Sequence, residues 1–413
     1  MANIDIDAER LLASLRELGR IGALEGGGVC RLALTAEDKA GRDWVLARMN
    51  ALGMSVSVDG IGNVVGVYGG REDVPPVMVG SHIDTVRTGG LYDGNYGVLA
   101  GLEVVRTLKD AGIRTSRPLA VAFFTNEEGS RFAPDMMGSL VFQGDLPLET
   151  ALDTKGIDGT TVRENLERIG YRGTAPVGAA KVDSYVELHI EQGPVLDIEK
   201  ITIGAVEGVQ GISWTEFQVS GVSNHAGTTP MRLRHDAAQV AARIACFARD
   251  LARELGGDQV ATVGSMTVFP NLVNVIPNRV VFTVDLRNTD EEILRLAEQR
   301  LWAFADEASA AEGTQISRRS LARFEPVAFH PELVKLVEQT ARGIGYSVRR
   351  LPSGAGHDAQ ILARLCPAAM IFVPSVGGLS HNVREHTEPG DLVAGARVLL
   401  QVLMQLADRK TSQ

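Results

Sequence analysis

The sequence predicts an α/β protein in which a mainly parallel-sheet domain is interrupted by an inserted α+β domain. Three observations support this prediction: short apolar runs alternate with helical spacings, the pattern changes near Gly208, and the alternation resumes after Pro326. A chain of 413 residues is also long for one core and fits two domains. We therefore expect residues 1–208 and 327–413 to form the larger domain and residues 209–326 to form the inserted domain.

The first part of the chain carries the alternating pattern. An amphipathic helix is expected at the N-terminus, followed by a buried strand at 77–81 (VMVGS). A helix is expected at 95–109, and Gly112 stops the helical pattern shortly after it. Residues 119–125 (LAVAFFT) and 184–190 (SYVELHI) are apolar enough for further buried strands. Strand, helix and strand at this spacing favour parallel pairing.

The middle of the chain has a different pattern, and the last part returns to the first one. In the middle we expect half-exposed or amphipathic elements: strands at 212–220, 260–268 and 279–288, and helices at 235–255 and 290–312. After Pro326 the expected elements are a helix at 331–342, a buried strand at 368–373 (AAMIFV) and a helix at 390–408. The inserted domain is therefore expected to lie between two halves of the larger one.

The composition excludes several classes of function. The net charge is −10 and no basic block is present, which argues against nucleic acid as a partner. No run of about 18 apolar residues is present, so no membrane span is expected. Three scattered cysteines (Cys30, Cys246 and Cys366) offer no disulfide framework and fit reduced thiols, so a cytoplasmic location is expected.

Histidine is scarce and its positions are informative. The chain has eight histidines, of which five lie in glycine- and acid-rich segments at the ends of predicted strands: His82, His189, His225, His357 and His381. Ligand sites of α/β sheets lie at the carboxyl ends of the strands. The other three, His235, His330 and His386, receive no role and are expected to be solvated.

The segment GSHIDTVRTGGLYDG (80–94) has the composition of a metal site. His82 and Asp84 are two residues apart, so on a strand they face the same side, and a carboxylate commonly holds the second nitrogen of a metal-binding imidazole. Asp93 follows in a glycine-flanked loop, where a carboxylate can bridge two ions. Each residue alone fits a loop hydrogen bond better than a metal site, but the set favours a metal.

Two adjacent acids follow the predicted strand at 119–125, in FTNEEGSRF. Glu127 and Glu128 are electrostatically costly at a buried strand end unless positive charge lies near, although a solvated helix N-terminus also favours acids. With metal ions present, one carboxylate can bind an ion and the other can act as a general base.

Two more segments, ELHIEQGPVLD with His189 and GGLSHNVREH with His381, complete a nitrogen–oxygen ligand set that suits zinc, manganese, cobalt or nickel. No HExxH, GxSxG or Walker motif competes with this interpretation.

The chain resembles the family of N-carbamoyl-L-amino acid hydrolases, β-ureidopropionases and allantoate amidohydrolases, within the clan of two-metal aminoacylases and carboxypeptidases. The resemblance spans nearly the whole chain and is carried by GSHIDTVRTGGLYDGNYGVLAGLEV, FTNEEGSRF, ELHIEQGPVL, NHAGTTPM, NVIPNRVVFTVDLRN, LPSGAGHDA and GGLSHN, in this order.

The resemblance implies that residues 1–208 and 327–413 form a metal-binding catalytic domain and that the inserted domain, residues 209–326, dimerises and closes on the substrate. It also implies two divalent metal ions per subunit, with zinc expected first and manganese, cobalt or nickel as alternatives. It implies five ligands: His82 and His189 for one ion, Glu128 and His381 for the other, and Asp93 as the bridge. Glu127 is then the general base and Asp84 orients His82.

The resemblance also assigns residues to the substrate. His225 is expected to reach the active site of a partner subunit in a homodimer and to bind the oxygen that becomes negative during the reaction. Arg287 is expected to bind the substrate carboxylate through its guanidinium fork, although a surface ion pair is an equal reading from the residues alone. Further polar contacts are expected from four residues: Gln192, Asn274, Gly356 and His357.

The expected function is hydrolysis of the carbamoyl group of an N-carbamoyl amino acid, which releases the amino acid, ammonia and carbon dioxide. A histidine at 189 is typical of this family, where many peptidase relatives have a carboxylate, so it favours carbamoyl substrates over peptides. The alternatives are an allantoate amidohydrolase, an N-acyl amino acid hydrolase or peptidase, and a non-catalytic binding protein on the same fold.

Overall fold

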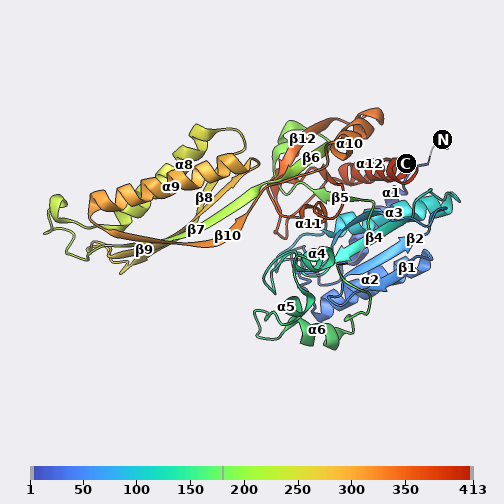
Figure 1. Cartoon of the computed structure of the whole chain (residues 1–413), viewed down its shortest axis with the longest axis horizontal. Coiled ribbons are helices and arrows are strands. Elements are labelled where there is room, and N and C mark those ends of the chain that lie inside the picture. Colours follow the sequence, from blue (N-terminus) through green and yellow to red (C-terminus); the bar gives the residue numbers. More distant parts are fainter. Residues whose placement is uncertain (1–3, 179–180, 410–413) are drawn as a thin grey trace. The chain divides into compact units, whose positions relative to one another are not determined.

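The computed structural model describes residues 4–178 and 181–409, and these divide into two compact units. The first unit comprises Met1–Glu207 and Phe329–Gln413, and the second comprises Gly208–Ala328 (Figure 1). The second unit is therefore inserted in the sequence of the first. Each unit has its own sheet and its own helices.

In the described ranges the strands of the first unit belong to a nine-stranded mixed sheet, whose edge strand Val327–Ala328 lies by sequence in the second unit. The strand order is β1 (Ser55–Val58), β2 (Val64–Tyr68), β4 (Leu119–Phe124), β3 (Val77–His82), β5 (Ser184–Ile190), β13 (Ala368–Val373), β6 (Ile203–Val209) and β11 (Val327–Ala328), and β12 (Val348–Ser353) also pairs with β6.

The four central strands, β4, β3, β5 and β13, run parallel, whereas the strands toward both edges pair antiparallel. Every residue of these central strands is buried, as expected for parallel strands that are covered on both faces.

Helices cover this sheet. α3 (Asn95–Asp110) packs on β3, β4 and β5, and α12 (Pro389–Ala407) packs on α3, β5 and β13. The remaining helices of the first unit are α1 (Ala8–Gly19), α2 (Ala36–Ala51), α4 (Met137–Gln143), α5 (Leu148–Leu152), α6 (Val162–Ile169), α7 (Val195–Glu199), α10 (Pro331–Gly343) and α11 (Asp358–Leu362). Among helices of the described residues, only α12 has the length and apolar composition of a membrane span, and 61% of its most apolar window is buried within the protein. α12 is thus a core helix of the first unit.

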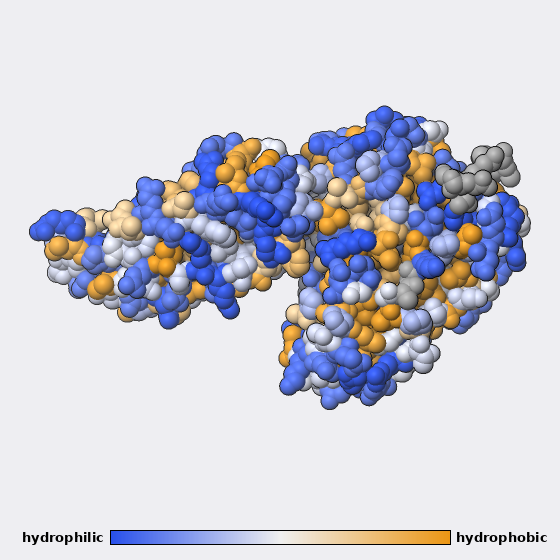
Figure 2. All heavy atoms as spheres, in the orientation of Figure 1, coloured by the Kyte–Doolittle hydropathy of each residue, from blue (hydrophilic) through white to orange (hydrophobic). Residues whose placement is uncertain are grey.

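The described part of the second unit contains a four-stranded antiparallel sheet in the order β10 (Gln315–Phe324), β7 (Gly211–Ser220), β9 (Arg279–Asn288) and β8 (Val260–Phe269). Buried residues alternate with half-buried or exposed ones along β7 and β9, and the buried face packs on α8 (Ala237–Leu255) and α9 (Glu291–Glu312). Phe217 and Phe282 stack at a ring-centroid distance of 5.3 Å within this core. Figure 2 shows hydrophobic residues distributed among hydrophilic ones over the visible face of both units.

The predicted α/β class is confirmed, with differences in detail. The parallel pairing is confined to the centre of the sheet, and the short antiparallel strands β1 and β2 were not predicted. β10 was also missed, because its sequence, QISRRSLARF, is too polar to suggest a strand. α8 begins at Ala237 rather than at 235 because the side chain of Asp236 caps the helix by accepting from the backbone N–H groups of Ala238 and Gln239.

Candidate metal centre

The candidate site lies at the carboxyl ends of the four parallel strands. His82 is the last residue of β3, and Glu127 follows β4 after two residues. His189 is the penultimate residue of β5, and His381 lies in the loop between β13 and α12. Because parallel strands end at the same edge of the sheet, segments far apart in sequence bring these side chains together.

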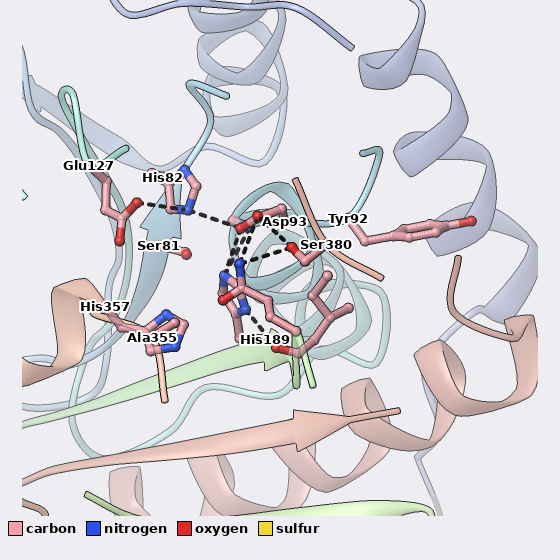
Figure 3. A network of polar contacts seen from close by, with 12 residues as sticks. Ser81, His82, Tyr92, Asp93, Glu127, His189, Ala355, His357 and Ser380 are labelled. Atoms are coloured by element: carbon pink, nitrogen blue, oxygen red, sulfur yellow. Dashed lines mark hydrogen bonds and ion pairs between the residues drawn. The ribbon is translucent and has the colours of Figure 1, made fainter. Parts of the chain in front are cut away.

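Asp93 occupies the middle of the site (Figure 3). Its Oδ1 lies 3.5 Å from Nε2 of His82 and 3.3 Å from Nε2 of His189, and its Oδ2 lies 3.4 Å from Nε2 of His381. The same nitrogen of His381 is 3.3 Å from Oε2 of Glu128. Asp93 therefore has one oxygen in each of two groups that could hold a metal ion, one with His82 and His189 and one with Glu128 and His381.

The two buried imidazoles have a defined orientation. Nδ1 of His82 donates to the backbone carbonyl of Asp84 and Nδ1 of His189 donates to that of Ile190, each at 2.9 Å. Since a carbonyl can only accept, both Nδ1 atoms carry hydrogen. The backbone N–H of Gly94 lies 3.1 Å from Nε2 of His189, which requires a lone pair on that nitrogen. This is the tautomer in which Nε2 can bind a metal.

The structure corrects one detail of the expected role of Asp84. Its backbone carbonyl, and not its carboxylate, holds the ring of His82. The carboxylate instead accepts from the backbone N–H groups of Glu127 and Glu128, at 3.3 and 3.4 Å. The reason is that β3 ends at His82, so the strand alternation that would place both side chains on one face does not reach Asp84.

The loops that carry these residues are held in uncommon backbone conformations. Gly94 has φ of +66°, and a Cβ atom there would lie 2.4 Å from the ring of His82, so only glycine fits. Asn126, Gln192 and His381 also have positive φ although they are not glycines. Such residues cost about 1–3 kcal/mol each and persist where the surroundings determine the conformation.

The buried carboxyl groups of the site favour bound cations. Burial, reinforced by Asp93, raises the pKa of Glu128 to about 8. Burial also raises the pKa of Glu127 well above its usual range. Burial alone would lower the pKa of His82, but Glu127 and Asp93 outweigh burial and raise it. None of the described residues that line the cavity is lysine or arginine, so the donor set fits bound divalent ions, which would balance its acids.

Three of the predicted substrate residues lie in this unit. Gly356 and His357 line the same cavity of about 130 Å³ as the ligand candidates. His357 is buried and its Nε2 lies 2.9 Å from Oγ of Ser353, and burial lowers its pKa, so the ring is neutral. Gln192 also lines the cavity, and its Nε2 donates to Oδ2 of Asp93 at 2.9 Å and to Oγ of Ser380 at 3.0 Å.

The other predicted substrate residues lie in the second unit. His225 and Asn274 are neighbours there, since the backbone N–H of Ala226 donates to the carbonyl of Asn274 at 2.9 Å and both side chains are exposed. Arg287 lies on β9, and its Nη2 donates to Oδ2 of Asp285 at 2.8 Å.

Three residues at the site were not assigned from the sequence. Ser380 and Glu385 lie in the His381 loop and contact the Asp93 segment, and Asp135 lines the cavity. The available signal for Glu385 was an acid four residues after His381 in a glycine-rich segment.

The arrangement has known counterparts. Residues 78–405 match the model of peptidase family M20/M25/M40. The chain belongs to this family. It is 42% identical over 407 residues to the N-carbamoyl-L-amino-acid amidohydrolase of Rhizobium meliloti, covering 98% of each chain. It is 35% identical over 393 residues to the allantoate amidohydrolase of Bacillus subtilis, covering 94% of this chain and 95% of the relative.

A solved structure of a hydantoinase/carbamoylase family amidase from Burkholderia multivorans superposes with a TM-score of 0.97. That protein is 45% identical to this chain, and the match covers 99% of this chain and 100% of the other. Family M20 is generally metal-dependent, in agreement with the clusters around Asp93. The expected enzyme class, a hydrolase of carbon–nitrogen bonds in linear amides, is confirmed.

Proposed function

We propose that this protein hydrolyses the carbamoyl group of N-carbamoyl amino acids with two divalent metal ions. The observation that carries the proposal is the position of Asp93, with one oxygen in each of the two ligand groups. The ligands would be His82, His189 and Asp93 for one ion and Asp93, Glu128 and His381 for the other. Zinc is proposed first, with manganese, cobalt and nickel as alternatives, and a cytoplasmic location is proposed with it.

Bound divalent ions supply positive charge that polarises the ureido carbonyl and makes a nearby water more acidic. Glu127 belongs to the same cavity without being part of either ligand group, and its Oε2 lies 3.3 Å from Nε2 of His82. Glu127 would take a proton from the attacking water and pass it to the nitrogen that leaves when the C–N bond breaks. The carbamate then decays to ammonia and carbon dioxide.

His225 would donate to the developing oxyanion. Its Nδ1 accepts from the backbone N–H groups of Gly227 and Thr228, at 3.0 and 3.3 Å. A nitrogen that accepts two N–H groups carries no hydrogen, so the hydrogen is on Nε2, and this side chain is exposed. The loop thus presents a neutral donor of the kind that stabilises a negative oxygen.

We further propose that His225 acts in the active site of a partner subunit of a homodimer. β8 is an edge strand of the second unit and exposes apolar side chains such as Val260 and Met266, which fits an interface between copies of this chain.

Subunit complementation is the test of this shared site. Mixing His225→Ala protein with Glu127→Gln protein, under conditions that exchange subunits, should give heterodimers with one intact site. Random exchange predicts about a quarter of wild-type activity, well above either parent. If heterodimers form, as shown by differently tagged subunits, and activity does not rise, His225 does not serve the partner's site.

Arg287 would bind the substrate carboxylate, which would replace the carboxylate of Asp285 as the acceptor of its guanidinium. Arg287→Lys keeps the charge but loses the two-pronged fork, so KM for N-carbamoyl amino acids should rise about 10-fold or more. Arg295→Lys is the matched control, because Arg295 is a solvent-exposed arginine of the same unit that pairs with Glu291. Equal KM values for the Arg287 variant and the control would mean that another residue binds the substrate carboxylate.

Allantoate is the second candidate substrate, because the Bacillus subtilis relative bears that activity in its name. Ammonia release should be measured from N-carbamoyl α-amino acids, N-carbamoyl-β-alanine and allantoate, each with zinc, manganese, cobalt or nickel added. Turnover of allantoate alone would mean that allantoate is the substrate in place of an N-carbamoyl amino acid. Turnover of none of these compounds would overturn the proposed function.

A further inference from the structure

Glu385 is a buried acid that belongs to neither ligand group. Its side chain lies in the loop between β13 and α12 and is 4% exposed. Oε1 accepts from the backbone N–H groups of Tyr92 and Asp93, at 3.0 and 3.3 Å. The carboxylate therefore fastens the segment that carries the central aspartate to the segment that carries His381.

The fit between these two segments is close. A Cβ atom at Gly90 would lie 2.0 Å from Oε1 of Glu385, so the loop before Asp93 can pass this carboxylate only because residue 90 is glycine. The close approach of this loop to the carboxylate of Glu385 thus depends on the glycine.

Ser380 connects Glu385 to Asp93 in a second way. Its Oγ accepts from Nε2 of Gln192 at 3.0 Å and lies 3.3 Å from two possible acceptors, Oε2 of Glu385 and Oδ2 of Asp93. The hydroxyl has one hydrogen, so it can donate to only one of these oxygens at a time. Oδ2 of Asp93 is the oxygen that faces His381 in the second ligand group.

Oδ2 of Asp93 also accepts from Nε2 of Gln192 at 2.9 Å, so this oxygen has one further lone pair. We propose that Glu385 is a positioning residue that accepts the Ser380 hydrogen and thereby leaves this lone pair of Oδ2 available to a cation in the Asp93–Glu128–His381 group. This inference rests on the proposed two-metal function. Through its other oxygen Glu385 fixes the backbone of Asp93, so both effects act on the same bridging carboxylate. Replacement of a residue that hydrogen-bonds a metal ligand commonly lowers the metal affinity about 10- to 100-fold.

Glu385→Gln separates the two effects. The amide oxygen still accepts the backbone N–H groups of Tyr92 and Asp93, but the amide nitrogen faces Ser380 as a donor. The Ser380 hydrogen must then go to Asp93, where it competes with the ion. Stepwise zinc titration of the metal-free protein, with calorimetry and bound-metal analysis, should show the second zinc weakened about 10- to 100-fold and the first unchanged.

The double variant Ser380→Ala/Glu385→Gln decides whether the hydroxyl carries the effect. Relative to Ser380→Ala alone, the glutamine should no longer weaken the second zinc, because no hydroxyl hydrogen remains to compete. An equal loss with and without Ser380 would mean that Glu385 acts only through its charge, and the proposal would be overturned.

Asp59→Asn provides a matched control for loss of a buried carboxylate. Asp59 is 6% exposed, and its Oδ1 accepts from the backbone N–H groups of Ile61 and Asn63 while Oδ2 accepts from the Asn63 side chain. This variant should lower the melting temperature yet keep both zinc affinities. A wild-type protein that binds no second zinc would overturn the proposed function, whereas two tight zinc ions in both wild type and Glu385→Gln would overturn only this inference.

Discussion

Glu127→Gln is expected to lower kcat by about 10²- to 10⁴-fold while both metal ions remain bound. The amide keeps the size and shape of the side chain but cannot take a proton from water. Because Glu127 would act first as base and then as acid, both steps lose their proton carrier. The measurement is steady-state ammonia release together with metal analysis of the same sample.

Glu128→Gln is the control for this variant, since the two residues are adjacent and both are buried at the end of β4. Oε2 of Glu128 lies 3.3 Å from Nε2 of His381, within the second ligand group, so its replacement should lower the metal content toward one ion per subunit. Equal metal loss in the two variants would contradict the division of roles between base and ligand.

Removal of the metal ions is expected to abolish activity, and addition of a divalent transition metal should restore it. Without cations the cavity holds the acids Asp93, Glu127 and Glu128 with no lysine or arginine among its described lining residues, and nothing then polarises the carbonyl. Dialysis against a chelator, metal analysis and assay before and after zinc addition test this expectation. Full turnover by protein shown to contain no metal would refute the two-metal interpretation.

The same experiment has a pH dependence with a defined sign. In the metal-free protein the pKa of Glu128 is raised to about 8, so near pH 7 this carboxyl carries a proton. An ion can bind there only by displacing that proton. Zinc uptake should therefore release protons, and zinc should bind more weakly as the pH falls below about 8.

The central part of the fold was predictable because its signals are local and strong. β4 and β13 are apolar throughout, and β3 and β5 are mainly apolar, and such runs belong to parallel strands buried on both faces. Polar residues that follow such strands are expected at one edge of the sheet, and the structure places His82, Asp93 and His189 together there. The antiparallel edges were not predictable in the same way, since β1 is four residues long and β10 is largely polar and exposed.

The contacts of the site depend on geometry that the sequence does not contain. Asp84 lies two residues after His82, but the strand ends between them, and the carboxylate turns toward the backbone of Glu127 and Glu128. Glu385 contacts residues almost 300 positions earlier in the chain, and no periodicity connects it with Asp93. Arg287 and Asp285 are two residues apart on β9, so their side chains share one face of the strand, and their pairing identifies no substrate.

The spread of the ligand candidates over the chain has a consequence for biosynthesis. The group of His82, Asp93 and His189 is complete once β5 has been synthesised, whereas the group of Asp93, Glu128 and His381 needs the loop after β13, which follows the whole inserted unit. A nascent chain therefore contains the first group well before the second.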